Sequence, residues 1–214
     1  MNKASLHIVV DPLCGWTYAA APLIELADAH EGLDVQIHCG GMITGERRRR
    51  ITPEWREFVM GHDRRIAEVS HQPFGDNYFN GLLKNSGVLL DSEPPTTAIL
   101  AAKTLGVSAA IMLNQSQKAW FLNGEDITQL SVLAKVACEA GVDESEFTIQ
   151  FERLAGDKTQ QFILNSRALL NRFGGQGFPS AALETSEGVE PLNISRYYGD
   201  PQGWRTTLNS RFDK

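Results

Sequence analysis

The sequence predicts an α/β fold whose core is interrupted by a long helical segment. The chain begins with strand, helix and strand patterns, and it ends with helix, strand, strand and helix patterns. Strands joined by a helical crossover within one sheet are usually parallel, and the connection is right-handed. We therefore expect 1–52 and 156–214 to form one discontinuous domain, with 53–155 as a helical insertion.

The first strand, helix and strand follow from local patterns. Residues 6–10 are rich in β-branched side chains, which predicts a buried strand. Residues 33–39 alternate apolar and polar side chains, which predicts a second strand with one buried face. Residues 15–31 have helical spacing of apolar side chains, and Pro22 within them predicts a kink.

The later elements are marked by glycine and proline. Residues 97–105 are apolar on nearly all sides, which predicts a buried helix, and Glu93-Pro94-Pro95 is interpreted as its entry. A helix over 157–173 is expected to end at Gly174, as helices often do at glycine. The remaining expected elements are a short strand within 177–184, a second over 189–193, and a terminal helix over 201–212.

Composition restricts the class of protein. The net charge is -6, so a general attraction to nucleic acid or to an anionic membrane is not expected. The first apolar run is too short for a signal peptide, and no stretch approaches the ~18 apolar residues of a membrane span. We predict a soluble cytoplasmic protein. The tract ERRRR at 46–50 is interpreted as a solvated segment, with an anion site or a contact to glutathione carboxylates as the alternative.

The three cysteines differ in their expected surroundings. Their odd, sparse count argues against a disulfide framework, and their spacing suggests no zinc site. Cys14 precedes a predicted helix, whose N-terminus would lower the thiol pKa and favour a nucleophilic thiolate. Cys39 and Cys138 lie on apolar faces of a predicted strand and helix, so both are expected to be packing residues. A merely buried Cys14 remains the alternative.

The segment DPLCGWTYA, 11–19, resembles the active-site segment of the DsbA family of the thioredoxin superfamily. It is most similar to a cytoplasmic branch of protein-disulfide isomerase-like members, in which D-P-x-C-x-W-C-Y is typical. The resemblance extends over most of the chain and includes GGMITGERR, HDRRIAEVSHQPFGDNY, DSEPPTTAILAA, GGQGFPS and YYGDPQGWR. It implies a thioredoxin-like fold with a large all-helical insertion, as in DsbA.

The resemblance also assigns roles. It implies that Cys14 is the nucleophile and that Pro179 is a cis-proline opposite it. Phe178 would then offer its backbone to an extended substrate, and Trp16 would provide an apolar shelf. The chain departs from the family at Thr17, where a resolving cysteine is usual. Threonine cannot release a mixed disulfide, but its hydroxyl can stabilise the Cys14 thiolate.

These residues predict a thiol-disulfide oxidoreductase, or protein-disulfide isomerase-like enzyme, that acts through one thiol on thiol or disulfide substrates. We expect no metal and no prosthetic group, with glutathione as the candidate co-substrate and a homodimer as the candidate assembly. A glutathione-dependent transferase or isomerase of the kappa-like type, whose relatives dimerise and usually carry serine in place of Cys14, is one alternative. A redox-silent binding module is the other. His62 and His71 lie in the insertion and are weak candidates for contact with the thiol.

Overall fold

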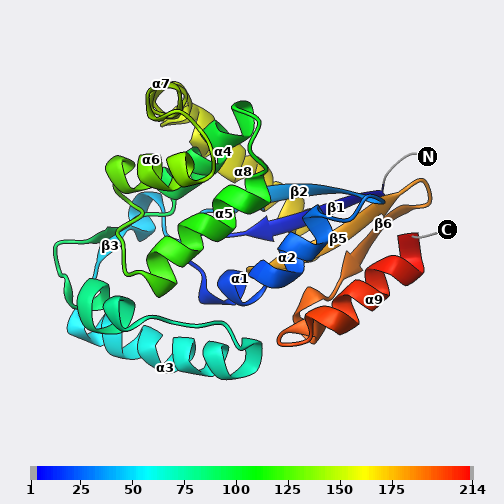
Figure 1. Ribbon diagram of the computed structural model, residues 1–214, viewed down its shortest axis with the longest axis horizontal. Coiled ribbons are helices and arrows are strands. Elements are labelled where there is room, and N and C mark those ends of the chain that lie inside the picture. The colour runs from blue at the N-terminus through cyan, green and yellow to red at the C-terminus, as the bar shows by residue number, and fades with distance from the viewer. Residues whose placement is uncertain (1–3, 213–214) are drawn as a thin grey trace.

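The computed structural model of the protein describes residues 4–212 and is built around a four-stranded sheet with the order β2-β1-β5-β6 (Figure 1). β1 (Ala4–Val10) pairs in parallel with β2 (Leu33–Cys39) on one side. On the other side β1 pairs antiparallel with β5 (Ser180–Thr185), which pairs antiparallel with β6 (Gly188–Leu192). The two ends of the chain therefore meet in one sheet, as the sequence predicts.

The predicted helix over 15–31 consists of two helices, so the expectation of one kinked helix is wrong. α1 (Gly15–Ala19) and α2 (Ala21–Asp28) are separated at Ala20. Pro22 lies in the first turn of α2, where a missing N–H costs little. The proline thus begins a second helix, and α1 is left as a short helix directly after Cys14.

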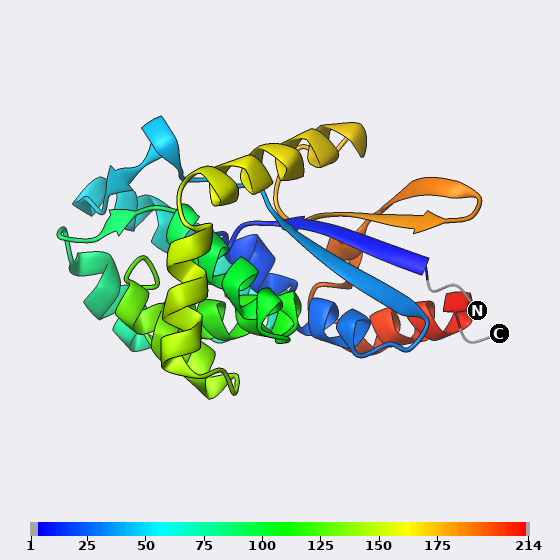
Figure 2. The ribbon, with the colours of Figure 1, turned by 90° about the horizontal axis from the view of Figure 1, so that it is seen from above.

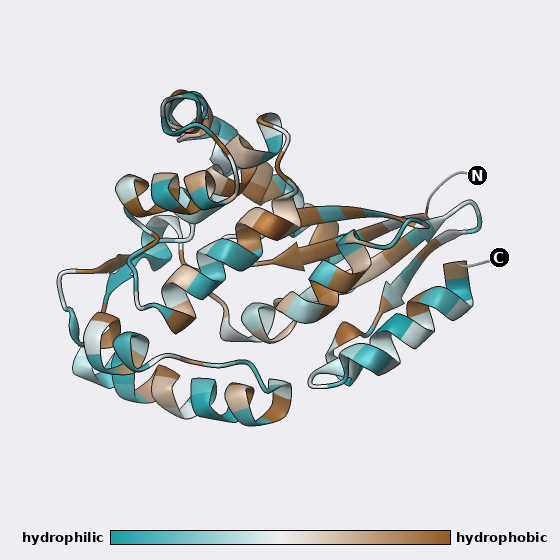
Figure 3. Ribbon diagram, viewed as in Figure 1, coloured by the Kyte–Doolittle hydropathy of each residue, from teal (hydrophilic) through white to brown (hydrophobic). Residues whose placement is uncertain are grey.

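Helices cover both faces of the sheet. α8 (Asp157–Arg172) lies over one face, and α2 and α9 (Pro201–Phe212) lie on the other (Figure 2). The fully buried Trp204 of α9 donates its indole N–H to the carbonyl of Leu23 in α2, over 2.8 Å. In Figure 3, β1 is mostly apolar, whereas α9 shows polar residues outward.

The expected helical insertion is present between β2 and α8. It contains α3 (Pro53–Ser70), α4 (Glu93–Thr104), α5 (Ala109–Gln117), α6 (Leu130–Glu139) and α7 (Glu144–Leu154). Shorter pieces are β3 (Arg49–Arg50), β4 (Leu89–Leu90), the 3-10 turns η1 (Gly45–Arg47), η3 (Leu82–Lys84) and η5 (Ile194–Tyr197), and the π turns η2 (Asn77–Gly81) and η4 (Lys118–Leu122). One apolar core runs from the sheet into these helices. Within residues 4–212 no helix is long and apolar enough to cross a bilayer.

The prediction that Cys138 faces the core is wrong, because its side chain is exposed. The buried face of α6 is formed by Leu133, Ala134, Val136 and Ala137. Leu130, from which the apolar spacing was counted, is itself only half-buried. The true buried stripe is therefore rotated away from Cys138. The prediction for Cys39 is confirmed, since its side chain is fully buried in β2.

Candidate active site

Cys14 lies at the edge of the sheet where β1 ends. The Asp11 carboxylate accepts the backbone N–H of Leu13 over 2.9 Å, and the Asp11 carbonyl accepts the N–H of Cys14 over 3.1 Å. This Asx turn reverses the chain after Val10 and places Cys14 as the N-cap of α1. The thiol therefore sits between a strand end and a helix start, in agreement with the sequence pattern.

Phe178 and Pro179 meet Cys14 from the other end of the chain. The peptide bond between them is cis, as the resemblance implies, and β5 begins at the next residue. The Cys14 Sγ donates to the Phe178 carbonyl over 3.5 Å. Because β5 is the neighbour of β1 in the sheet, residues far apart in sequence come together at this edge.

The Phe178 ring packs against a glycine that the sequence alone did not mark. A Cβ atom on Gly40 would lie 2.3 Å from Cε1 of the Phe178 ring, a distance that real Cβ contacts do not show. Arg167 of α8 holds this segment in place by donating to the carbonyls of Gly40, over 2.7 Å, and Gly41. Gly40 and Arg167 thus position the residue that contacts the thiol.

A stacked aromatic pair borders the thiol on its other side. Trp16 and Tyr198 have ring centroids 5.5 Å apart at an interplanar angle of 18°. The Tyr198 hydroxyl donates to the Trp16 carbonyl over 3.2 Å. Burial raises the pKa of Tyr198, and the charge of a Cys14 thiolate raises it further. Tyr198 therefore stays neutral beside the thiol. It belongs to the YYGDPQGWR segment, but its role could not be predicted from that segment.

Thr17 is fully buried one turn after Cys14. Its Oγ1 accepts the backbone N–H of Asp11 over 3.3 Å. The backbone N–H and the hydroxyl of Thr17 both favour the Cys14 thiolate and lower its pKa. Thr17 thus occupies a position from which it can stabilise the sulfur.

The expected low pKa of Cys14 is nevertheless wrong. Burial raises the pKa of the thiol to about 11, and the nearby charge of Asp11 adds to the effect of burial. The side chain is only 8% exposed, and α1 is five residues long. Loss of solvation therefore outweighs the Thr17 hydrogen bonds and the short helix's N-terminal field. At rest the thiol is protonated and donates to Phe178.

Asp11 is a buried acid next to this thiol. Its carboxylate accepts the N–H of Met42 over 2.5 Å and the hydroxyl of Ser92 over 3.1 Å, in addition to the N–H of Leu13. Burial raises the pKa of Asp11 to about 6, although these hydrogen bonds and the charge of Arg167 act in the opposite direction. A group that exchanges its proton near neutral pH thus lies beside the candidate nucleophile.

A pocket of about 450 Å³ opens beside this arrangement. Its wall combines apolar rings, small polar residues and one cation, and is formed by Trp16, Arg65, Val69, Gly177, Phe178, Pro179, Ser180, Ser195 and Tyr198. All predicted site residues except the buried Cys14 and Thr17 line it. His62 and His71 do not.

The other two thiols lie in different surroundings. Cys39 is paired with Val10 inside the sheet, and burial raises its pKa above the ordinary range. Cys138 is exposed on α6, and all three cysteines are free. Among residues 4–212, no three His, Cys, Asp or Glu side chains are arranged to hold a metal ion.

Solved structures similar to this chain place the fold and the site in context. Cytosolic disulfide reductase DsbM from Pseudomonas aeruginosa is 40% identical, with 98% of each chain covered and a TM-score of 0.91. The same Pseudomonas protein with GSH is 38% identical, with 98% of this chain and 100% of that chain covered and a TM-score of 0.89. A Nitrosomonas europaea protein described as a protein disulfide isomerase is 25% identical, with 98% and 97% covered and a TM-score of 0.77.

More distant likeness supports the fold alone. A 2-hydroxychromene-2-carboxylate isomerase is 13% identical, with 98% of each chain covered and a TM-score of 0.56. No family model and no curated protein sequence matches the chain. Together with the observed sheet and helices, the structural matches confirm the predicted α/β fold with a helical insertion.

Proposed function

We propose that this chain, which belongs to the DsbA family of the thioredoxin superfamily, is a thiol-disulfide oxidoreductase that acts through the single thiol of Cys14. One observation carries the proposal. The Cys14 thiol contacts the Phe178 carbonyl at the end of the sheet, and the resemblance implies that Thr17 stands where the family has its resolving cysteine.

The first step is thiolate attack on a disulfide. The Cys14 thiol loses its proton, and its sulfur bonds to one sulfur of the substrate. The substrate S–S bond breaks, and the second sulfur leaves as a thiolate that takes up a proton. One mixed disulfide and one thiol result, with no net oxidation. Since the resting thiol has a pKa of about 11, entry of substrate must help remove the proton.

Phe178 couples substrate binding to deprotonation. At rest its carbonyl accepts the S–H of Cys14. A thiolate cannot donate, so deprotonation frees that carbonyl for a backbone N–H of an extended substrate. Backbone hydrogen bonds of this kind are a common way for a protein to hold an extended peptide. The half-buried Phe178 ring, fixed against Gly40, would form an apolar wall of the clamp.

Asp11 is the group we assign to proton exchange with the thiol. Its pKa of about 6 leaves most molecules ionised at neutral pH with a measurable protonated fraction. The Thr17 hydroxyl group connects the Asp11 backbone to the sulfur, since it accepts from the Asp11 backbone N–H and hydrogen-bonds the sulfur. This network can lower the cost of charge transfer to a buried site.

The second step needs an external thiol. Thr17 cannot attack the mixed disulfide, and Cys39 is fully buried. We assign this step to reduced glutathione, whose thiolate would attack the substrate-side sulfur or the Cys14-side sulfur. Attack on the substrate-side sulfur returns Cys14 directly. DsbM has been described with GSH, and the pocket beside Cys14 holds about 450 Å³ with Arg65 as a partner for a carboxylate. A cytoplasmic location, where glutathione is abundant, completes the proposal and agrees with the description of DsbM as cytosolic.

A glutathione-dependent isomerase or transferase is a second candidate. The observation that favours it is the Cys14 thiol donating to the Phe178 carbonyl, because a protonated thiol can equally donate to a bound glutathione thiolate, as a serine hydroxyl would. In that reaction Cys14 would form no disulfide.

The two candidates differ in the covalent state of Cys14. We would incubate the Cys138→Ala protein with oxidised glutathione at pH 8, because exposed Cys138 would react indiscriminately. We expect one glutathione on Cys14 by intact mass and peptide mapping, its release by reduced glutathione, and no adduct in Cys14→Ala/Cys138→Ala. A tight glutathione complex without an adduct would contradict the oxidoreductase and favour the second candidate. An internal Cys14–Cys39 disulfide would contradict the single-thiol mechanism.

A further inference from the structure

The arginine tract at 46–50 borders a second hollow that the proposed function does not use. This hollow has a volume of about 430 Å³ and lies where η1, the start of α4 and α8 meet. Its wall is formed by Thr44, Gly45, Glu46, Arg47, Glu93, Gln160, Ile163, Leu164 and Arg167. None of these residues lines the pocket beside Cys14.

Two arginines of the wall have no carboxylate partner. Neither Arg47 nor Arg167 forms an ion pair with any acidic residue between positions 4 and 212. Burial and the neighbouring charge of Arg47 hold the pKa of Arg167 below its ordinary value, although the charge of buried Asp11 acts in the opposite direction. Two like charges near each other in a concave wall repel, and an anion between them would remove the repulsion.

The orientation of Arg167 is already fixed. Its Nε donates to the Gly40 carbonyl and one terminal nitrogen donates to the Gly41 carbonyl. A guanidinium carries five N–H donors, so the remaining ones are available to a ligand without a change of rotamer. Arg47, by contrast, is exposed on η1 and free to close on a bound group.

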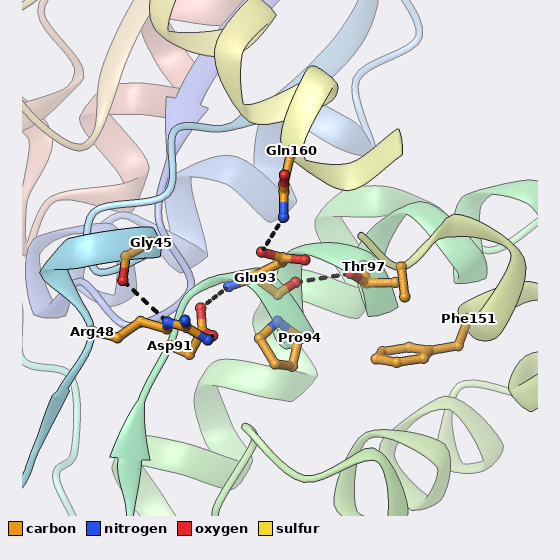
Figure 4. Close-up of a pocket in the computed structure, with 9 residues that line it drawn as sticks. Gly45, Arg48, Asp91, Glu93, Pro94, Thr97, Phe151 and Gln160 are labelled. Carbon is orange, nitrogen blue, oxygen red and sulfur yellow. Dashed lines mark hydrogen bonds and ion pairs between the residues drawn. The ribbon is translucent and has the colours of Figure 1, made fainter. Parts of the chain in front are cut away.

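This hollow continues into an adjoining hollow of about 270 Å³, which Figure 4 shows. The two hollows share Gly45, Glu93 and Gln160 and together form one groove. Gln160 of α8 reaches toward Glu93 at the start of α4, and its amide donates to the carboxylate over 3.4 Å. Pro94, Thr97 and Phe151 line the far part. The groove therefore has the two arginines at one end, the carboxylates of Glu46 and Glu93 in the same wall, and apolar surface beyond them.

We propose that this groove is a carboxylate-binding site in which Arg47 and Arg167 hold the anion of an organic acid no larger than a short peptide. Guanidinium pairs suit the planar carboxylate, and Ile163 with the exposed Leu164 suits a short apolar chain behind it. Binding needs no thiol chemistry, so the site stands or fails independently of the exchange reaction.

The groove lies behind the clamp of the thiol site. Arg167 holds Gly40, Gly40 packs on the Phe178 ring, and the Phe178 carbonyl accepts from Cys14. The carboxylate has two sources of the same chemistry. It can belong to the molecule whose sulfur reacts at Cys14, or to a separate acid bound at the same time.

The test measures binding in the Cys14→Ala protein by titration calorimetry, with succinate as the probe and uncharged succinamide as its control. We expect succinate to bind at one saturable site and succinamide not to bind. Arg47→Gln should weaken succinate binding at least tenfold, because a charge-assisted hydrogen bond is lost from an exposed residue without packing. Arg172→Gln, which removes an exposed charge from the same helix α8, should leave binding unchanged.

Equal binding of succinamide, or equal weakening by Arg47→Gln and Arg172→Gln, would overturn the site, as would the absence of saturable succinate binding. The source of the carboxylate follows from the Cys138→Ala protein treated with oxidised glutathione. If succinate competes with adduct formation and Arg47→Gln raises the half-saturating glutathione concentration, the carboxylate belongs to the reacting molecule. If succinate binds equally well to the protein that already carries the adduct, a separate acid occupies the site.

Discussion

Cys14 and Cys39 follow the same pattern at the ends of two neighbouring parallel strands, yet their surroundings differ. Cys39 is the last residue of β2, pairs with Val10, and is fully buried. Cys14 comes after β1 has ended, at the first turn of α1, and is 8% exposed with its sulfur against a carbonyl. Burial raises the pKa of both thiols, and the Asp11 charge adds to both.

The comparison shows that a high pKa does not by itself separate a reactive thiol from an inert one. Each thiol also has one threonine hydroxyl that lowers its pKa, Thr17 for Cys14 and Thr96 for Cys39. What differs is access. Cys14 lies against Phe178, which lines an open pocket, whereas Cys39 is enclosed by the strand ladder and the core.

Access should produce the largest measurable difference. In the Cys138→Ala protein, iodoacetamide should modify Cys14 about 10³-fold faster than Cys39 or more, because Cys39 reacts only after unfolding. The thiol pKa of about 11 predicts that the Cys14 rate rises tenfold per pH unit above pH 7 without a plateau below pH 10. Rates from mapped peptides over this pH range test both statements. A plateau in the Cys14 alkylation rate below pH 8 would show that the thiol pKa is low, as the sequence predicts.

Displacing Phe178 should have the next largest effect. In Gly40→Ala the new Cβ would overlap the Phe178 ring, so the ring and its carbonyl must shift. We expect glutathione exchange at Cys14 to slow by roughly tenfold to a hundredfold. Gly61→Ala is the control, since nothing lies within 4 Å of a Cβ on that helical glycine. Equal exchange rates in the two variants would show that the position of Phe178 does not affect the reaction at Cys14.

Asp11→Asn should lower the pKa of both Cys14 and Cys39, because the Asp11 charge raises both. Loss of the negative charge should lower the pKa of Cys14 by roughly one unit, so alkylation at pH 8 rises about tenfold. The pKa of the Asp11 carboxyl is raised in the folded protein, so its ionisation costs stability as pH rises from about 4 through about 6. Thermal unfolding across this range should show that loss in the parent protein and not in the variant, on top of a constant cost of about 1–3 kcal/mol for disturbed hydrogen bonds. An unchanged Cys14 profile would show that the Asp11 charge does not reach the sulfur.

Thr17→Val should give the smallest effect and should change the pKa of Cys14 but not that of Cys39. The isosteric change removes the hydroxyl that favours the thiolate, so the pKa should rise and alkylation at pH 8 should slow about threefold to tenfold. Thr17→Ser keeps the hydroxyl and should restore the rate. A valine variant as fast as the parent would make Thr17 a packing residue.

Local sequence patterns predicted the strands and the helical insertion, and the family resemblance predicted the meeting of Cys14 with Phe178 and Pro179. These patterns failed for properties that depend on tertiary packing. The Cys14 pKa depends on how closely Phe178 and the insertion cover the sulfur, which no local pattern encodes. Gly40, Arg167 and Tyr198 were not predicted, because each acts through one contact with a residue distant in sequence. Pro22 marked a helix boundary correctly but was interpreted as a kink.

Because Trp16, stacked on Tyr198, lies beside the thiol, the site can be followed by intrinsic tryptophan fluorescence. Indole emission responds to solvent and is quenched by a disulfide close by, and Trp16 is two residues from Cys14. A mixed disulfide at this sulfur would therefore dim the Trp16 signal, while the three other tryptophans, Trp55, Trp120 and Trp204, supply the background. The protein thus carries its own reporter, and each turnover can be followed in real time without a label.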